Sequence, residues 1–193
     1  MNGQDESRAL ALRALNEAPP ASLLRAPLDQ VFAEHFRQRC LCRVLDEIAA
    51  EDVWDREKAA AALRFLRGDF DLHRRDEQED LFVMLRKRLR PQDGIADMLR
   101  RLGEGHSGSA AEAAAIADAM AAALETGDGR GPAPLLRVWL CDFSTRQRRR
   151  LIEENAFILP FARARLSRRA LETLGRRMAA RRGIAWPGDD DAD

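Results

Sequence analysis

Five side chains in this sequence are of the types, and stand at the positions, that could bind a metal ion together. His35, His73 and His106 are the only histidines of the chain, and each falls in the middle of a different apolar stripe with helical spacing. Glu77 follows His73 by one helical turn on the same stripe, and Glu154 occupies a fourth stripe. Burying imidazole and carboxylate groups costs several kcal/mol per charged group unless an opposite charge compensates. A metal ion gives that compensation, and helical bundles build their metal sites from inward-facing His and Glu residues.

Four long helices are expected to carry these side chains. The apolar patterns run over about residues 28–48, 54–89, 95–124 and 134–166. The expected core stripe of the first helix consists of Leu28, Val31, Phe32, Cys42, Leu45 and Ile48. The glycines within 103–108 are expected to interrupt the third helix, and Pro160 to kink the fourth. Because short loops join them, the four helices predict an all-α fold, an antiparallel up-down-up-down four-helix bundle.

Further segments are expected on both sides of this bundle. Residues 1–27 are predicted to be a peripheral N-terminal segment with a short helix over 7–17, ended by two prolines. Residues 28–166 form the predicted bundle. Residues 167–193 are predicted to be an extra C-terminal helix, capped by Ser167 and ended by Gly183, followed by an acidic tail.

The composition narrows the class of protein. The chain is 46% hydrophobic and 33% charged, which is typical of a globular domain. It has no tyrosine and few β-branched residues, which favours helix over sheet. Its formal net charge is zero, so no nucleic-acid or membrane partner is expected. No segment has the apolar length of a signal peptide core or a membrane span, and a cytoplasmic location is expected.

The remaining reactive or charged groups are expected to be structural. Cys40, Cys42 and Cys141 are an odd number without CxxC spacing, which argues against a disulfide framework and a zinc ribbon. They are predicted to be packing residues. The acidic residues at positions 76, 79 and 80 and the arginines within 146–150 are predicted to form solvated helix faces.

At the helices that carry the histidines, the sequence resembles the hemerythrin-like HHE cation-binding family. The most specific segments are FLRGDFDLHRRDEQEDLFVMLRKRL at 65–89 and RRLIEENAFILPFARARLS at 149–167. Weaker similarity lies in AEHFRQRCLCRVLDEIA at 33–49 and LRRLGEGHSGS at 99–109. The family's usual ending is similar to LETLGRRMAARRG at 171–183. The resemblance covers residues 28–183.

The resemblance implies a non-haem iron site. In the family these positions commonly hold a pair of irons, which carboxylates bridge and five histidines bind. The family's roles include reversible dioxygen binding, sensing and storage. Carried over to this sequence, the implied metal ligands are His35, His73, Glu77, His106 and Glu154.

The sequence departs from the family pattern at two histidines. Arg150 stands where the family has the histidine of its fourth helix, and Ala110 stands where it has a second histidine on the third. Asn155 is an alternative to Glu154 for the carboxylate position of the fourth helix. One ion at most is therefore expected. The two histidines and one carboxylate that remain in the first half of the site suit Fe(II), with Zn(II) and Mn(II) as alternatives.

Three functions are consistent with these residues. The leading hypothesis is a metal-binding protein with a degenerate site. Its expected role is the sensing or storage of iron or of a small molecule such as dioxygen or nitric oxide, or the sensing of redox state, and not the turnover of a substrate. The second is a metal-free helical interaction module in which Arg150 replaces the metal and pairs with Glu77 or Glu154. The third is a mononuclear Fe(II) oxidoreductase, which needs an open coordination position and a substrate pocket.

Overall fold

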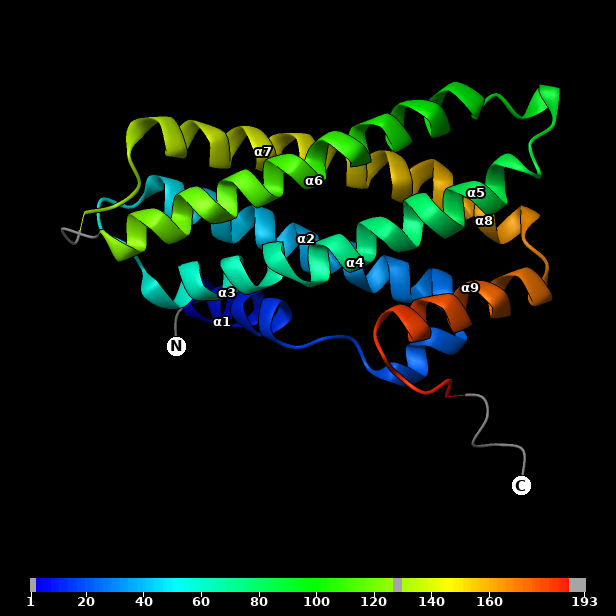
Figure 1. The fold of residues 1–193 in the computed structure, drawn as a ribbon, viewed down its shortest axis with the longest axis horizontal. Helices are drawn as coiled ribbons and strands as arrows, with labels where there is room; N and C mark the ends of the chain where they lie inside the picture. The colour runs from blue at the N-terminus through cyan, green and yellow to red at the C-terminus, as the bar shows by residue number, and fades with distance from the viewer. Residues whose placement is uncertain (1–2, 127–129, 188–193) are drawn as a thin grey trace. The chain divides into compact units, whose positions relative to one another are not determined.

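The computed structural model describes residues 3–126 and 130–187, and these residues form helices joined by short connections. Figure 1 shows the ribbon. The α-helices are α1 Gly3–Asn16, α2 Pro27–Ala50, α3 Arg56–Arg67, α4 Asp69–Arg75, α5 Phe82–Arg86, α6 Ala96–Glu125, α7 Pro134–Glu153, α8 Leu159–Arg165 and α9 Arg168–Arg181. Two 3-10 helices are η1 Ala21–Arg25 and η3 Pro91–Asp93. Two π-helical segments are η2 Asp76–Leu81 and η4 Glu154–Ile158. Within the described ranges there is no strand, so the predicted all-α class is confirmed.

The chain divides into two compact units, each with its own hydrophobic core. The first unit comprises Met1–Ala18, Phe36–Asp71 and Ser109–Arg150, and the second comprises Pro19–His35, Leu72–Gly108 and Leu151–Asp193. Several long helices contribute one part to each unit. The units are described separately below.

In the first unit, α1 packs against α3 (Figure 1). The α1 side chains Ala11, Leu12 and Leu15 are buried, and they belong to the same apolar cluster as Leu45 and Phe65. Burial of apolar side chains contributes about 1.5–3 kcal/mol for each large residue. The N-terminal helix is thus part of the core of its unit.

In the second unit, α9 packs against η1 and against the π-helical segment η2 (Figure 1). The helix begins at Ser167, whose hydroxyl accepts a hydrogen bond from the backbone N–H of Ala170. Gly175 lets two neighbours approach closely, because a Cβ there would lie 2.3 Å from the carbonyl oxygen of Leu24 and 2.8 Å from the ring of Trp186. The chain turns away at Gly183, whose φ of +65° is in the left-handed region that favours glycine.

Several predicted helix boundaries are confirmed. The long helix α2 begins at Pro27, where a missing N–H costs nothing. The second predicted helix, expected from about residue 54, begins with α3 directly after Asp55. The carboxylate of Asp55 accepts hydrogen bonds from the backbone N–H groups of Glu57 and Lys58. The last helix begins and ends where Ser167 and Gly183 predicted.

Other sequence-based expectations were wrong. The glycines within 103–108 do not interrupt the third long helix, because α6 runs unbroken from Ala96 to Glu125; the cost of glycine in a helix is only about 1 kcal/mol each. Phe32 is 51% exposed and does not belong to the core stripe of α2. Cys141 is exposed, so it is not a packing residue. The second and fourth predicted helices each change into a π-helical segment midway.

Among the described residues, no helix is both long enough and apolar enough to cross a membrane.

Candidate metal centre

The five residues predicted to bind metal all belong to the second unit, and the structure brings them together in its interior. His35 comes from α2, His73 from α4, Glu77 from η2, His106 from α6 and Glu154 from η4. All five side chains are buried, with exposed fractions of 0% for His35 and 3% for His73 at the extremes. The predicted convergence of imidazole and carboxylate groups in a dry interior is therefore observed.

Glu77 lies at the centre of this cluster and contacts all three histidines. Its Oε1 is 3.1 Å from Nε2 of His35, and the two atoms are hydrogen-bonded. Its Oε2 is 3.1 Å from Nε2 of His73 and 3.4 Å from Nε2 of His106. Each histidine thus directs the same ring nitrogen, Nε2, towards one carboxylate.

Glu154 contacts the cluster from the other π-helical segment. Its Oε1 is 2.9 Å from Nε2 of His106, and its Oε2 is 3.5 Å from Nε2 of His35. Glu154 therefore spans two histidines with its two oxygens, and Glu77 spans all three. Carboxylates that offer one oxygen to each of two neighbouring sites are the arrangement found in the di-metal carboxylate sites of helical bundles.

Two groups of donor atoms in the cluster are compact enough to hold a metal ion. His35, His73 and Glu77 form one group, and Glu77, His106 and Glu154 form the other; within each group the donor atoms lie within 4.8 Å of one another. Glu77 is common to both. The first group is the two-histidine, one-carboxylate set that the sequence predicted, and the second joins the two remaining predicted ligands to it.

Several polar atoms of this cluster are buried without a hydrogen-bond partner. Neither ring nitrogen of His73 has a hydrogen bond, and Oε2 of Glu77 and Oε2 of Glu154 also have none, although all are buried. Buried polar atoms in proteins nearly always have a partner, and a role in binding an ion is a recognised reason for exceptions. The unsatisfied atoms are donors of the kind that bind Fe(II), Zn(II) or Mn(II).

Asn155 fixes the orientation of His35. Its side-chain Oδ1 lies 2.8 Å from Nδ1 of His35. Because a carbonyl oxygen can only accept, the proton of this hydrogen bond is on Nδ1, and Nε2 faces Glu77. Metal-binding histidines typically donate their second ring N–H to such an acceptor. The sequence suggested Asn155 as an alternative ligand, whereas in the structure Asn155 is hydrogen-bonded to His35, one of the candidate ligands.

Two aromatic contacts pack the rings of the cluster. The rings of His35 and His73 meet edge to face, with centroids 5.0 Å apart. The ring of His106 is stacked on Phe82, with centroids 5.2 Å apart and an angle of 24° between the planes. These contacts restrict the imidazoles to orientations in which Nε2 faces the two carboxylates.

In the metal-free state the charges of the cluster support one another. Burial by itself lowers the pKa of His73, but the neighbouring charge of Glu77 outweighs it and raises that pKa to about 9. Burial likewise raises the pKa of Glu77, but the charge of His73 and the hydrogen bond from His35 hold it well below its usual range. The centre therefore combines a carboxylate and an imidazolium when no ion is bound.

Two buried aspartates next to the candidate ligand Glu77 pair with arginines at the end of α9. Asp76 and Asp80, predicted to be solvated, are 0% and 3% exposed. Arg181, the last residue of α9, has its Nη2 2.7 Å from Asp80 Oδ2, and the next residue, Arg182, has its Nη1 2.7 Å from Asp76 Oδ2. The sequence did not reveal these ion pairs, because Arg181 lies 105 residues after Asp76 and the packing of α9 against η2 is a tertiary contact.

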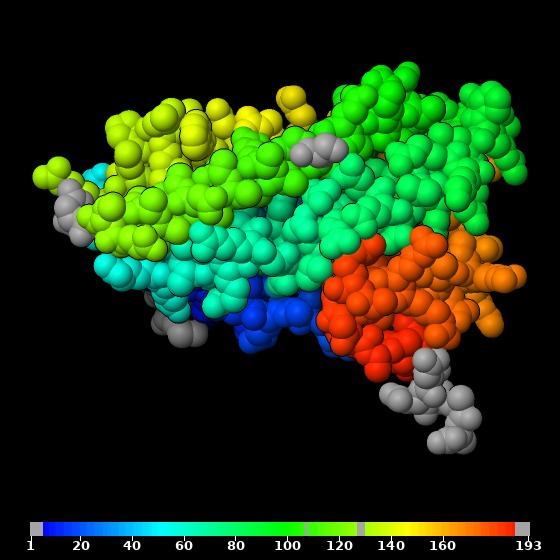
Figure 2. All heavy atoms as spheres, viewed as in Figure 1, coloured from blue at the N-terminus to red at the C-terminus, as the bar shows by residue number. Residues whose placement is uncertain are grey.

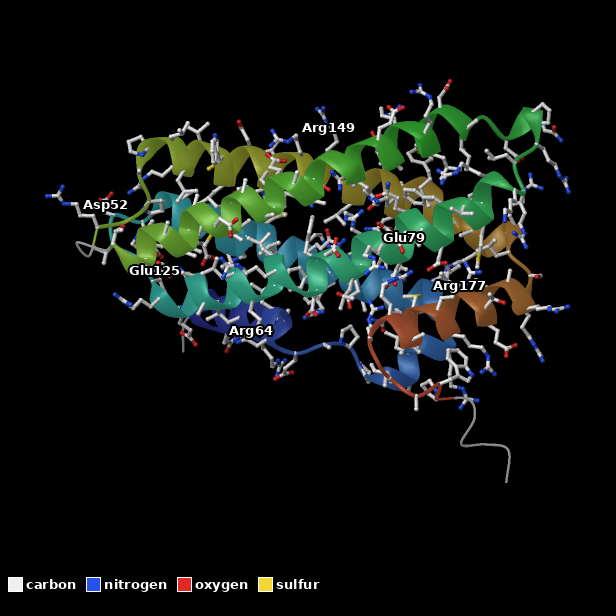
Figure 3. All side chains as sticks on the ribbon, viewed as in Figure 1. Asp52, Arg64, Glu79, Glu125, Arg149 and Arg177 are labelled. Atoms are coloured by element: carbon white, nitrogen blue, oxygen red, sulfur yellow. The ribbon has the colours of Figure 1, made fainter. Side chains whose placement is uncertain are left out.

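Glu79 and Arg177 mark the outer edge of the same contact between η2 and α9, and both are labelled in Figure 3. Glu79 is 46% exposed, as predicted for a solvated face. Arg177 Nη1 is 2.6 Å from Asp80 Oδ1 and is 56% exposed. The contact is thus buried on the side of the candidate centre and solvated on the outside.

Arg150 belongs to the first unit, and its Nη1 donates to Oγ of Ser109 at 3.0 Å. The sequence-based hypothesis paired this arginine with Glu77 or Glu154. Both glutamates have histidine contacts in the second unit, as described above. The replacement of a metal by Arg150 stays a prediction.

Comparison with protein-family models, with curated proteins and with solved structures gave no match. The case for a function therefore rests on the geometry of the histidine and glutamate cluster and on the resemblance of its sequence segments to the hemerythrin-like pattern.

Proposed function

We propose that this protein is a hemerythrin-like metal-binding protein, with an antiparallel four-helix bundle that holds non-haem iron. The observation that carries the proposal is the position of Glu77, a buried carboxylate within 3.1–3.4 Å of the Nε2 atoms of three histidines. A buried carboxylate surrounded by imidazoles from three separate helices is costly to assemble. Metal binding gives a physical reason for assembling it.

The proposed ion is held by His35, His73 and Glu77. Glu154 is the nearest candidate for a fourth ligand, because its Oε2 is 3.5 Å from Nε2 of His35. Two histidines and one carboxylate are a set typical of non-haem Fe(II), and Zn(II) and Mn(II) accept the same donors. A second ion bound by Glu77, His106 and Glu154 is the alternative stoichiometry.

The proposed role is sensing or storage linked to iron, dioxygen, nitric oxide or redox state. This role comes from the family that the sequence resembles, where such centres bind small molecules reversibly. Burial of every ligand supports a small diatomic molecule over a larger substrate, because no ligand atom lies at an open surface. The three free thiols are compatible with the predicted cytoplasmic location, where thiols stay reduced.

Metal analysis of isosteric variants tests the proposal. The full chain is purified without oxygen, incubated with Fe(II), desalted, and analysed for metal content and optical absorption. Glu77→Gln removes the shared negative charge and is expected to lower bound iron at least tenfold. Glu79→Gln is the matched control, because Glu79 is two residues away and 46% exposed; its iron content is expected to stay within twofold of the wild type. Wild-type protein that retains no iron, zinc or manganese would contradict the proposal.

A metal-free interaction module is the second candidate, and one observation favours it. His35–Glu77 and His106–Glu154 are hydrogen-bonded at 3.1 and 2.9 Å without an ion. The cluster can therefore be partly satisfied by its own protons. The same metal analysis separates the two candidates, because this one requires wild-type and Glu77→Gln proteins to be equally free of metal.

A further inference from the structure

A cavity of about 660 Å³ opens at the surface of the second unit, away from the residues of the candidate metal centre. It is lined by the end of η1, the beginning of α2, and residues of α8, α9 and the segment after α9. Figure 2 shows α9 at the molecular surface, in orange and red. The volume is in the range of 300–1,000 Å³ that is common for small-molecule sites.

The charge of this cavity is positive. Its lining contains four arginines and two acidic residues. Two of the arginines are compensated: Arg163 Nη2 is 2.6 Å from Asp29 Oδ1, and Arg176 Nη2 is 3.2 Å from Glu172 Oε1. Within residues 3–126 and 130–187, the guanidinium of Arg168 has no hydrogen bond or ion pair, although the backbone of Arg168 belongs to α9. An uncompensated guanidinium at a cavity wall is a suitable partner for a phosphate, sulfonate or carboxylate group.

The rest of the wall is apolar and flat. Leu171 and Trp186 line the cavity, and the guanidinium of Arg176 lies over the ring of Trp186, 5.1 Å from its centre. Gly175 allows this ring to lie against α9, because any side chain there would collide with it. The indole and the stacked guanidinium form a rigid surface, which suits a planar apolar group.

We propose that this cavity binds a small organic anion, with its acidic group at Arg168 and a flat apolar body against Leu171 and Trp186. The three features of the cavity support this class of ligand together: its volume, its excess positive charge and its flat apolar wall. The proposed site is separate from the candidate metal centre and does not depend on metal being bound there.

A fluorescent aromatic sulfonate, 1-anilinonaphthalene-8-sulfonate, is the probe. The titration uses the full chain with Trp54→Phe and Trp139→Phe, which leaves Trp186 as the single tryptophan. Binding next to Trp186 is expected to quench its emission by energy transfer to the probe. Circular dichroism of each variant checks that the helices are retained.

Two matched controls make the titration decisive. Arg168→Gln is expected to weaken binding about tenfold or more, whereas Arg169→Gln, the exposed neighbour outside the cavity lining, is expected to change it less than twofold. N-phenyl-1-naphthylamine, which has the same rings without the sulfonate, is expected to bind at least tenfold more weakly. Unquenched Trp186 emission, equal effects of the two arginine substitutions, or equal binding of the neutral probe would each overturn the proposal.

Discussion

At the scale of single residues, Asn155 shows how a neighbour can decide whether a histidine is a competent ligand. Its Oδ1 holds the proton of His35 on Nδ1, 2.8 Å away, so that Nε2 faces the shared carboxylate of Glu77. Hydrogen bonds of this kind fix both the tautomer and the orientation of the ring.

Replacing this acceptor should weaken metal binding without removing any ligand. Asn155→Ala is expected to lower the affinity for Fe(II) or Zn(II) by about 10–100-fold, the usual effect of losing such a partner. Asn155→Asp keeps an acceptor in the same place and is expected to stay near the wild-type affinity. Competition with a metal chelator measures both. Equal affinities of the Ala and Asp variants would show that Asn155 does not position His35.

Arg150 cannot bind a metal ion, and it occupies the position at which the resembled family has a metal-binding histidine. A guanidinium keeps its proton and repels a nearby cation. If Arg150 replaces a family histidine, Arg150→His should raise the iron bound per chain. Arg149→His is the matched control, because Arg149 is exposed (labelled in Figure 3) and its substitution should leave iron content unchanged. Unchanged iron content in Arg150→His would count against this role.

At the scale of elements, the two π-helical segments carry the two candidate bridging carboxylates. Glu77 is the second residue of η2, and Glu154 is the first residue of η4. Single-turn π-helical segments are rare in proteins, and those that occur often lie at functional sites. The extra residue per turn shifts the direction of the side chains that follow it. Both glutamates thus lie where a regular α-helix changes into a wider turn, next to the same histidines.

The helix α9 stabilises η2 through buried ion pairs. Arg181 is only 11% exposed and pairs with Asp76 and Asp80. Removing one partner of a buried pair costs about 3–5 kcal/mol, because the other charge is left uncompensated. Arg181→Met, which keeps the apolar stem, should lower the free energy of unfolding by up to this amount in a urea titration, because Arg182 still pairs with Asp76 and Arg177 with Asp80.

Arg177→Met is the matched control for this substitution. Arg177 is 56% exposed and pairs with the same Asp80. Exposed pairs contribute about 0–1 kcal/mol, so its loss should be small. Equal destabilisation by both substitutions would show that the buried ion pairs of Arg181 contribute no more to the free energy of unfolding than the exposed pair of Arg177.

At the scale of the whole molecule, each compact unit has one apolar cluster, and the three thiols belong to the first unit, where burial controls their access to reagents. Cys42 is 0% exposed, and burial raises the pKa of its thiol to about 12. Cys141 is exposed on α7. Thiol reagents attack the thiolate form, so a buried thiol with a raised pKa reacts slowly even in alkaline solution.

Alkylation should therefore distinguish the thiols according to the fold. With iodoacetamide at pH 8–9, Cys141 is expected to react within minutes and Cys42 at least a hundredfold more slowly, because at pH values well below about 12 its thiol stays protonated. In urea, where the core is open, both should react at similar rates. Peptide mass spectrometry follows each cysteine. Equal labelling of Cys42 and Cys141 in the native protein would contradict the buried position of Cys42.

The sequence by itself identified the buried histidines and glutamates of the candidate centre. His73 and Glu77 were found because a helix repeats every 3.6 residues, so one polar turn inside an apolar stripe is visible without any tertiary information. The same periodicity located the beginnings of α2 and α7, and the residue types of Ser167 and Gly183 located α9. Helix periodicity and capping are local properties, and for this reason the sequence reveals them.

Only the tertiary structure decided how these side chains meet. The role of Asn155, the burial of Asp76 and the pairing of α9 with η2 depend on segments that are far apart in the chain. The π-helical segments also depend on packing, because an extra residue in a turn leaves no mark in composition or spacing. Local periodicity predicts which face of a helix is buried, but the partners at that face are set by long-range packing.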